Sequence, residues 1–206
     1  MESIQYPKIE VAVRILRRGG VVALPTDTIY GLAADIYNED AISKIFAIKG
    51  RSNTKALPVL VGHLDQVDQL TSNIPEIGKI LMHKFWPGPL TILFRKAKSL
   101  SDTLTGLSGL VALRQPNHPV PIEVIKQLGS PITGTSANKT GLPTPSSAKD
   151  VDLMLGNTVD YVVPGACPPE NIASTVVDIS TDRLAVIREG HIPFASIQKY
   201  IDMSAI

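Results

Sequence analysis

The chain has 206 residues, 44% of them apolar, and a formal net charge of +1. This length predicts a single domain over residues 1–206 with a substantial core. The near-neutral charge excludes the global positive field that dominates sequence-independent nucleic-acid binding, although a local basic cleft is compatible with it.

Cysteine content and hydropathy indicate the compartment. The one cysteine, Cys167, excludes an internal disulfide framework and is typical of a reducing environment. No apolar run approaches the roughly 20 residues of a membrane span. The N-terminus has neither the basic start nor the apolar stretch of a signal peptide. We therefore expect a soluble, cytoplasmic protein with no membrane partner.

Hydrophobic spacing predicts the elements of the first half. A helix is expected over residues 7–18, where Ile9, Val13 and Leu16 recur at helical spacing. The fully apolar run at 21–25 is typical of a strand buried on both faces. Further patterns predict helices at 39–48, with Ile42, Ile45 and Phe46 inward, at 64–71 and at 76–85, and a strand at 57–62.

The second half begins at a rigid turn, WPGPL at 86–90, which leads into a clear strand at 90–96. Residues 99–109 are rich in Ser, Thr and Gly and are expected to form a mobile loop. Ser147 and Asp150 form a predicted capping box. Other patterns predict strands at 110–116, 159–164, 174–179 and 184–189, a strand that runs into polar residues at 131–138, and helices at 120–129 and 193–202. This alternation favours a single-domain α/β protein with a twisted mixed sheet flanked by helices.

Polar groups follow the first predicted strand, and a cationic loop follows the next helix. Thr26, Asp27 and Thr28 come directly after Pro25, where the apolar run stops. The loop carries cations at i, i+2 and i+6, namely Lys49, Arg51 and Lys55. Such groups suit a small polar ligand and an anion such as a phosphate chain, which predicts a basic central cleft. The alternative is a plain turn and helix cap facing a solvated loop.

Candidate ligand groups also end other predicted strands. Binding residues gather where the strands of an α/β sheet run out into loops, so we expect these groups to converge. They are Thr26 and Thr28, Arg114, Ser136 and Asn138, and Arg188.

Several common motifs are excluded. GTSANKTG at 134–141 lacks the glycine that precedes the lysine of a P-loop, and the prolines after it prevent the helix of a nucleophile elbow. The four histidines lack metal-ligand spacing, so no metal site is predicted and each is expected to be a surface or capping residue. Cys167 has no basic neighbour in the sequence to activate it.

Taken together, seven strings resemble the YrdC-like family of L-threonylcarbamoyladenylate synthases. They are PTDTIYGLAAD, KGRSNTKALPVLV, FWPGPLT, VALRQPNHP, TSANKTGLP, STVVD and IREG, in that order. The resemblance covers about residues 7–195, and its most specific part is K-x-R…K followed by S-x-N. Longer members carry an extra C-terminal domain, which this chain is expected to lack.

The resemblance implies that ATP, bicarbonate or CO2, and L-threonine form threonylcarbamoyl-AMP and pyrophosphate. A separate transferase complex would then modify the adenosine beside the anticodon of certain tRNAs, and weak tRNA binding is a further expectation. The implied threonine-binding residues are Thr28, Arg114, Ser136 and Ser174. The implied nucleotide-binding residues are Lys49, Arg51, Lys55, Leu110 (through its backbone), Asn138, Ser146 and Arg188.

Two positions depart from the family pattern. Asp27 stands where members often have Glu, so the charge is kept. Leu110 stands where many members have Thr. At Leu110 a backbone contact with the ligand would survive this exchange, but a hydroxyl contact would not. No covalent nucleophile is evident. We expect catalysis by positioning and by the charges of Lys49 and Arg51, with Mg²⁺ on the phosphates.

Two other functions remain open from the sequence. One is a paralogous carbamoyl-adenylate-forming enzyme with another acceptor. The other is a non-catalytic module that binds double-stranded RNA or tRNA through the same cleft. The low net charge and the scarcity of aromatic residues disfavour the RNA-binding module.

Overall fold

The computed structural model describes residues 6–52, 55–181 and 184–204. In chain order the elements are α1 (Tyr6–Arg17), β1 (Val22–Leu24), β2 (Gly31–Ala33), α2 (Glu39–Lys49), β3 (Val59–Leu60), α3 (Asp65–Leu70), α4 (Glu76–Phe85), β4 (Leu90–Arg95), α5 (Asp102–Thr105), β5 (Leu110–Arg114), α6 (Pro119–Leu128), β6 (Ile132–Thr133), β7 (Thr135–Ser136), α7 (Ala148–Leu155), a 3-10 turn (Gly156–Thr158), β8 (Tyr161–Val162), β9 (Thr175–Asp178), β10 (Ala185–Arg188) and α8 (Phe194–Ser204).

The α/β class and the mixed strand directions are confirmed, and the strands are divided between two sheets. The smaller sheet has the order β7-β2-β1-β8, and the larger has the order β10-β9-β4-β5-β3-β6. In the smaller sheet β1 runs antiparallel to β2 and parallel to β8. In the larger sheet β4 runs antiparallel to β5 and parallel to β9.

The chain crosses from one sheet to the other at Gly134. Strand β6 pairs with β3 in the larger sheet, and β7, after Gly134, pairs with β2 in the smaller. The Gly134 N–H donates to the carbonyl of Pro58 at 2.7 Å, and a Cβ there would lie 2.5 Å from Leu60 Cγ. The crossing therefore requires glycine, and it explains why one predicted strand at 131–138 serves two sheets.

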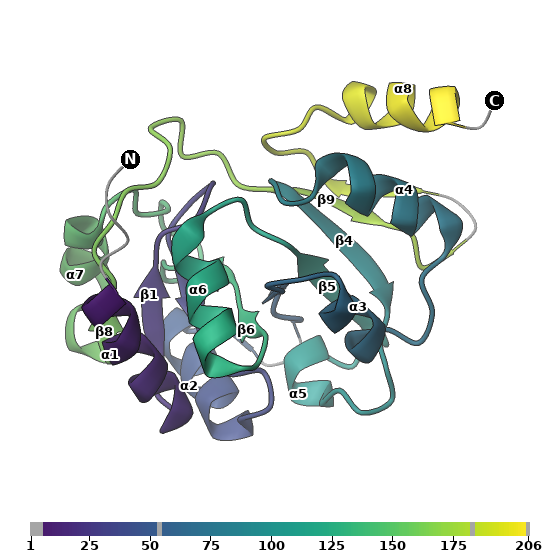
Figure 1. Cartoon of the computed structure of the whole chain (residues 1–206). Helices are drawn as coiled ribbons and strands as arrows, with labels where there is room; N and C mark the ends of the chain where they lie inside the picture. Colours follow the sequence, from purple (N-terminus) through teal and green to yellow (C-terminus); the bar gives the residue numbers. More distant parts are fainter. Residues whose placement is uncertain (1–5, 53–54, 182–183, 205–206) are drawn as a thin grey trace.

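Helices α1 and α6 cover the outer face of β1, and Figure 1 shows them side by side. The predicted inward residues Ile9, Val13 and Leu16 are each at most 3% exposed. They pack with the buried side chains of β1 and α6 in one apolar cluster. Burial of this helical stripe contributes about 1.5–3 kcal/mol for each large side chain.

Helix α2 fixes where the cationic loop begins. Asn38 Oδ1 accepts the Ala41 N–H at 2.9 Å, and Gly50, in the left-handed region at φ 57°, ends the helix. Ile42, Ile45 and Phe46 are buried as expected. Because both ends of α2 are capped, Lys49 is held in place as the last residue of the helix.

Some short elements differ from expectation. Strand β2 was not predicted, because three residues are too few to show an alternating pattern. The expected loop at 99–109 contains the one-turn helix α5.

The capping box of Ser147 and Asp150 is confirmed at the start of α7. Helix α8 packs beside α4 (Figure 1).

Candidate functional site

A cavity of about 420 Å³ lies where the two sheets meet. One wall is a face of the larger sheet, where the register places Thr91 opposite both Arg114 and Val176. The opposite wall comes from β2, β7 and the end of α2. Most of the predicted site residues line this one cavity: Thr28, Lys49, Arg51, Arg114, Ser136, Asn138, Ser174 and Arg188.

Thr26 organises the turn between β1 and β2. Its Oγ1 accepts the N–H groups of Thr28 at 3.1 Å and Ile29 at 3.2 Å, and donates to the Ile29 carbonyl at 2.7 Å. The Thr28 Oγ1 lies 3.0 Å from the same oxygen. Both threonines are buried, so this turn holds the Thr28 hydroxyl in a fixed position on the cavity wall.

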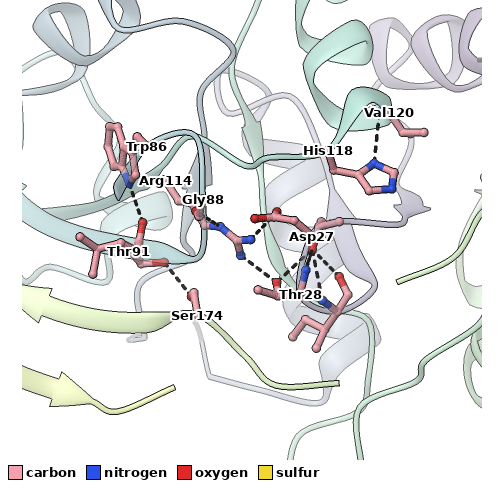
Figure 2. A network of polar contacts seen from close by, with 12 residues as sticks. Asp27, Thr28, Trp86, Gly88, Thr91, Arg114, His118, Val120 and Ser174 are labelled. Atoms are coloured by element: carbon pink, nitrogen blue, oxygen red, sulfur yellow. Dashed lines mark hydrogen bonds and ion pairs between the residues drawn. The ribbon is translucent and has the colours of Figure 1, made fainter. Parts of the chain in front are cut away.

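Arg114, at the end of β5, is 6% exposed. Its Nη1 donates to Thr28 Oγ1 at 2.8 Å and its Nη2 pairs with Asp27 Oδ1 (Figure 2). Burial lowers the pKa of Arg114, and the Asp27 charge acts against that shift. The second carboxylate oxygen of Asp27 is buried and has no hydrogen-bond partner. The guanidinium is thus rigidly oriented and its charge is locally compensated.

The turn at 86–90 holds the guanidinium from a third side. The Gly88 carbonyl accepts from Arg114 Nε at 3.0 Å, and the Gly88 N–H donates to the Gln115 carbonyl at 2.8 Å. Trp86 Nε1 donates to the Leu90 carbonyl at 2.7 Å, and this hydrogen bond closes the turn. A Cβ at Gly88 would lie 2.4 Å from the Phe85 carbonyl oxygen, so the turn accepts only glycine there.

Lys49 is 4% exposed and clamps the S-x-N segment to α2. Its Nζ donates to the carbonyls of Ser136 at 2.6 Å and Asn138 at 2.9 Å. Burial, with a smaller effect of the Arg51 charge, lowers the pKa of Lys49 to about 8. The Ser136 hydroxyl donates to Asn138 Oδ1 at 2.6 Å, which fixes both side chains of the motif. The cation is therefore surrounded by neutral oxygens.

Arg51 and Lys55 differ in placement. Arg51 is half-buried, lines the cavity and donates from Nη2 to the Ala56 carbonyl at 2.7 Å. Its Nε is buried and has no hydrogen-bond partner among the described residues, and burial lowers the pKa of the Arg51 guanidinium. Lys55 is exposed and is not among the residues that line the cavity. The structure therefore brings two of the three loop cations, Lys49 and Arg51, to the cavity.

A β-bulge directs Arg188 into the cavity. In the pairing of β10 with β9, Val186 faces Val177 but Arg188 faces Val176, so Ile187 is an extra residue. The Arg188 guanidinium donates from Nη2 to the Ser174 carbonyl at 2.7 Å and to the Ser174 Oγ at 3.2 Å. Burial lowers the pKa of Arg188.

Thr91 is a pocket residue that the sequence analysis missed. It is 3% exposed, lines the cavity, and its Oγ1 lies 2.8 Å from Ser174 Oγ (Figure 2). The available signal was one hydroxyl residue in the otherwise apolar start of β4. That signal is weak, because buried threonines are common in strands.

Two other predicted nucleotide-binding residues lie outside the cavity lining. Leu110 begins β5, four residues before Arg114, in the same row of side chains as Ala112, which does line the cavity. Ser146 is exposed, and its hydroxyl donates to Asp150 Oδ2 at 3.1 Å. Their roles stay predictions.

His118 and Cys167 lie near Asp27 but show no activation. His118 Nδ1 accepts the Val120 N–H at 3.2 Å as the N-cap of α6, which confirms its capping role, and burial lowers its pKa. Burial raises the pKa of Cys167 to about 11, so its thiol stays protonated at neutral pH.

Metal ligands and membrane helices were searched for in the described residues. In the ranges 6–52, 55–181 and 184–204, no group of three His, Cys, Asp or Glu side chains is placed to hold a metal ion. None of the residues found to line the cavity is acidic. Over the same ranges, no helix has the length and hydropathy needed to cross a membrane.

The fold and site define an α/β protein with a polar, cation-lined ligand pocket at the junction of two mixed sheets. A family model of the Sua5/YciO/YrdC domain, described as "Telomere recombination", matches residues 14–190. The chain belongs to this family.

Known relatives and a solved structure are similar to this chain over most of its length. The threonylcarbamoyl-AMP synthase of Bacillus subtilis is 37% identical over 200 residues, covering 97% of this chain and 58% of that protein. The one from Pseudomonas paraeruginosa is 32% identical and covers 86% of this chain and 95% of that protein. The crystal structure of Pyrococcus abyssi Sua5 complexed with L-threonine superposes with a TM-score of 0.94 at 34% identity, covering 97% of this chain and 59% of that one. This chain thus spans 58–59% of the length of the Bacillus and Pyrococcus proteins.

Proposed function

We propose that this protein is a threonylcarbamoyl-AMP synthase, which makes threonylcarbamoyl-AMP and pyrophosphate from ATP, bicarbonate or CO2, and L-threonine. The observation that carries the proposal is the joining, in one cavity, of a buried Arg114–Thr28 contact with the cations Lys49 and Arg51. Relatives named threonylcarbamoyl-AMP synthases and a structural neighbour that binds L-threonine support it.

Threonine occupies the end of the cavity formed by Arg114, Thr28 and Ser174, with Ser136 at its side. The planar guanidinium suits a carboxylate, and its orientation is fixed by three other contacts. Hydroxyl groups then pair with the polar groups of the amino acid. A ligand that leaves such buried groups unpaired is rejected strongly.

The triphosphate occupies the end with Lys49, Arg51 and Asn138, and Arg188 reaches it across the cavity. The threonine amine and bicarbonate form a carbamate with loss of water, and a carbamate oxygen attacks the α-phosphorus as pyrophosphate leaves. Lys49 and Arg51 neutralise charge that grows on the phosphoryl oxygens in the transition state. The chain supplies positioning and charge, with no covalent intermediate.

In this proposal Mg²⁺ enters the cavity bound to ATP. The cavity lining found here holds hydroxyls, amides and cations but no carboxylate, so its residues do not fit a resident metal site. The Mg²⁺ ion is held by the phosphate oxygens and arrives with ATP.

The product carries a mixed anhydride between carbamate and phosphate, which is an activated acyl donor. A separate threonylcarbamoyl transferase complex takes it and modifies the adenosine beside the tRNA anticodon. Direct tRNA contact, if made, is weak and depends on salt, in keeping with the net charge of +1.

The test is ATP-dependent pyrophosphate release by the purified protein with bicarbonate, with each amino acid in turn. We expect release with threonine and much less with serine or valine. Nucleotide binding without release for any amino acid would refute the synthase and favour a paralogous enzyme with another acceptor. Salt-dependent RNA binding without nucleotide binding would favour the RNA-binding module.

A further inference from the structure

Two pairs of hydroxyl groups face the amino-acid end of the cavity, and the second contains Thr91, which has no role assigned above. Thr26 pairs with Thr28 at 3.0 Å, and Thr91 pairs with Ser174 at 2.8 Å. Figure 2 shows Thr28 in contact with the guanidinium of Arg114 and Ser174 in contact with Thr91. A hydroxyl donates only one proton, so the neighbouring contacts limit what each pair can offer a ligand.

In the first pair the neighbouring groups use the whole hydrogen-bonding capacity of the Thr26 hydroxyl. Its Oγ1 donates to the Ile29 carbonyl at 2.7 Å and accepts the N–H groups of Thr28 and Ile29. Both lone pairs of Thr26 are therefore occupied, and its 3.0 Å contact with Thr28 does not fix the direction of the Thr28 proton. Arg114 Nη1 donates to Thr28 at 2.8 Å, so Thr28 keeps its proton and one lone pair.

In the second pair one hydroxyl proton is left over for a ligand. Ser174 Oγ accepts from Arg188 Nη2 at 3.2 Å, and the hydroxyls of Thr91 and Ser174 share one of their two protons between them. No other acceptor for the second proton is found within the described ranges. If Thr91 donates to Ser174, then both lone pairs of Ser174 are used and its own proton is left for a ligand.

We propose that Thr91 is a positioning residue for the bound amino acid: it orders the Ser174 hydroxyl so that the pair donates one hydrogen bond to a substrate oxygen. This inference rests on the proposed function, since it takes L-threonine as the ligand.

The Thr91–Ser174 pair requires a hydrogen-bond acceptor on the ligand. A ligand with the polar groups exchanged or missing leaves a buried hydroxyl unpaired. The proposal therefore assigns part of the substrate selectivity to Thr91, a residue that acts through its neighbour.

The experiment compares Thr91→Val, which keeps the shape and removes the hydroxyl, with Thr91→Ser, which keeps the hydroxyl. Thr105→Val is the matched control, because Thr105 is 1% exposed and its hydroxyl bonds the Ser101 carbonyl away from the cavity. Binding of L-threonine and of ATP is measured by calorimetry, KM and kcat by pyrophosphate release, and stability by thermal unfolding.

Loss of one hydrogen bond corresponds to about a 10-fold weaker threonine affinity. We expect this loss, with a matching rise in the threonine KM and kcat within about 2-fold, for Thr91→Val only. ATP binding is expected to stay unchanged, and Thr91→Ser to restore threonine binding.

Unchanged threonine binding in Thr91→Val, or an equal loss in Thr91→Ser or Thr105→Val, would overturn the inference while leaving the proposed function intact. If the unaltered protein does not bind threonine, the proposed function fails and the inference fails with it.

Discussion

The two ends of the cavity carry positive charge in different ways. At one end Arg114 is buried and paired with Asp27, and its remaining contacts are fixed by Thr28 and Gly88. At the other end Lys49 and Arg51 contact neutral oxygens, and no ion pair is found for either within the described ranges.

This difference indicates two modes of anion recognition. Where the cation is already compensated, an incoming carboxylate is selected by hydrogen-bond geometry, and added salt has little effect because the pair is buried. Where the charge is uncompensated, a polyanion is attracted by the net field, and salt weakens that attraction. These two modes fit the amino acid and the triphosphate of the proposed reaction.

The largest effect is expected from Arg114→Ala. It removes the partner of a buried carboxylate, so we expect a loss of about 3–5 kcal/mol in the free energy of unfolding. Threonine binding should also be lost, while ATP binding stays within about 3-fold once the protein is folded. Denaturant unfolding and calorimetry at low temperature measure the two losses separately.

A second substitution separates stability from recognition. In the Arg114→Ala, Asp27→Asn double variant the uncompensated charge is gone, so we expect part of the stability to return without any return of threonine binding. Equal loss of both ligands in every variant would mean that Arg114 supports the fold and does not serve as a recognition residue.

Arg51→Ala is expected to have the next largest effect. Loss of a hydrogen-bonded charge on a phosphate corresponds to about 1.5–3 kcal/mol, or about 10- to 100-fold in ATP affinity, with threonine affinity unchanged. Lys55→Ala is the matched control, since Lys55 is exposed and outside the cavity lining. An ATP effect of Lys55→Ala as large as that of Arg51→Ala would show that the loop closes over the nucleotide.

The convergence of strand ends was predictable from the sequence, because apolar runs that stop at hydroxyls or arginines are visible without coordinates. The buried helical stripes of α1 and α2 and the capping box were predictable for the same reason, since each is a local periodic or spaced pattern. The strand positions alone placed five of the candidate site residues. They are Thr28, Arg114, Ser136, Asn138 and Arg188. The others came from the cationic loop or from the family resemblance.

Other features depend on tertiary structure. The division into two sheets follows from the contact of Gly134 with Leu60, residues far apart in the chain. The direction of Arg188 follows from a bulge at Ile187, which strict alternation does not predict. The pairing of Thr91 with Ser174 joins β4 to the segment before β9, 83 residues later. The pairing of Asp27 with Arg114 is likewise long-range.

A pH titration tests the uncompensated end directly. Burial lowers the pKa of Lys49 to about 8, so the free protein loses this charge as the pH rises through that value. A triphosphate stabilises the protonated form, so binding takes up a proton, and ATP affinity should fall by about 10-fold between pH 7 and pH 9. Threonine affinity should change less, because Arg114 keeps its charge over this range.

Calorimetry of ATP binding in buffers with different ionisation enthalpies checks the proton uptake. We expect the observed enthalpy to depend on the buffer near pH 8 and to lose that dependence near pH 6. A constant ATP affinity from pH 7 to pH 9 would contradict the prediction and indicate that the four oxygen contacts of Lys49 keep it charged.

The smallest effect concerns the loop that carries Ser146. Ser147 Oγ accepts the Asp150 N–H at 3.2 Å as the N-cap of α7, so Ser147→Ala should cost about 1 kcal/mol in the free energy of unfolding. Ser146→Ala is a matched neighbour, because its exposed hydroxyl reaches the same carboxylate without capping the helix. Ser146→Ala should leave the unfolding transition unchanged, and any loss of ATP affinity in that variant would then report direct contact with the nucleotide. If Ser146→Ala instead lowers stability as much as Ser147→Ala, the two hydroxyls share the capping role, and Ser146 serves the helix and not the nucleotide.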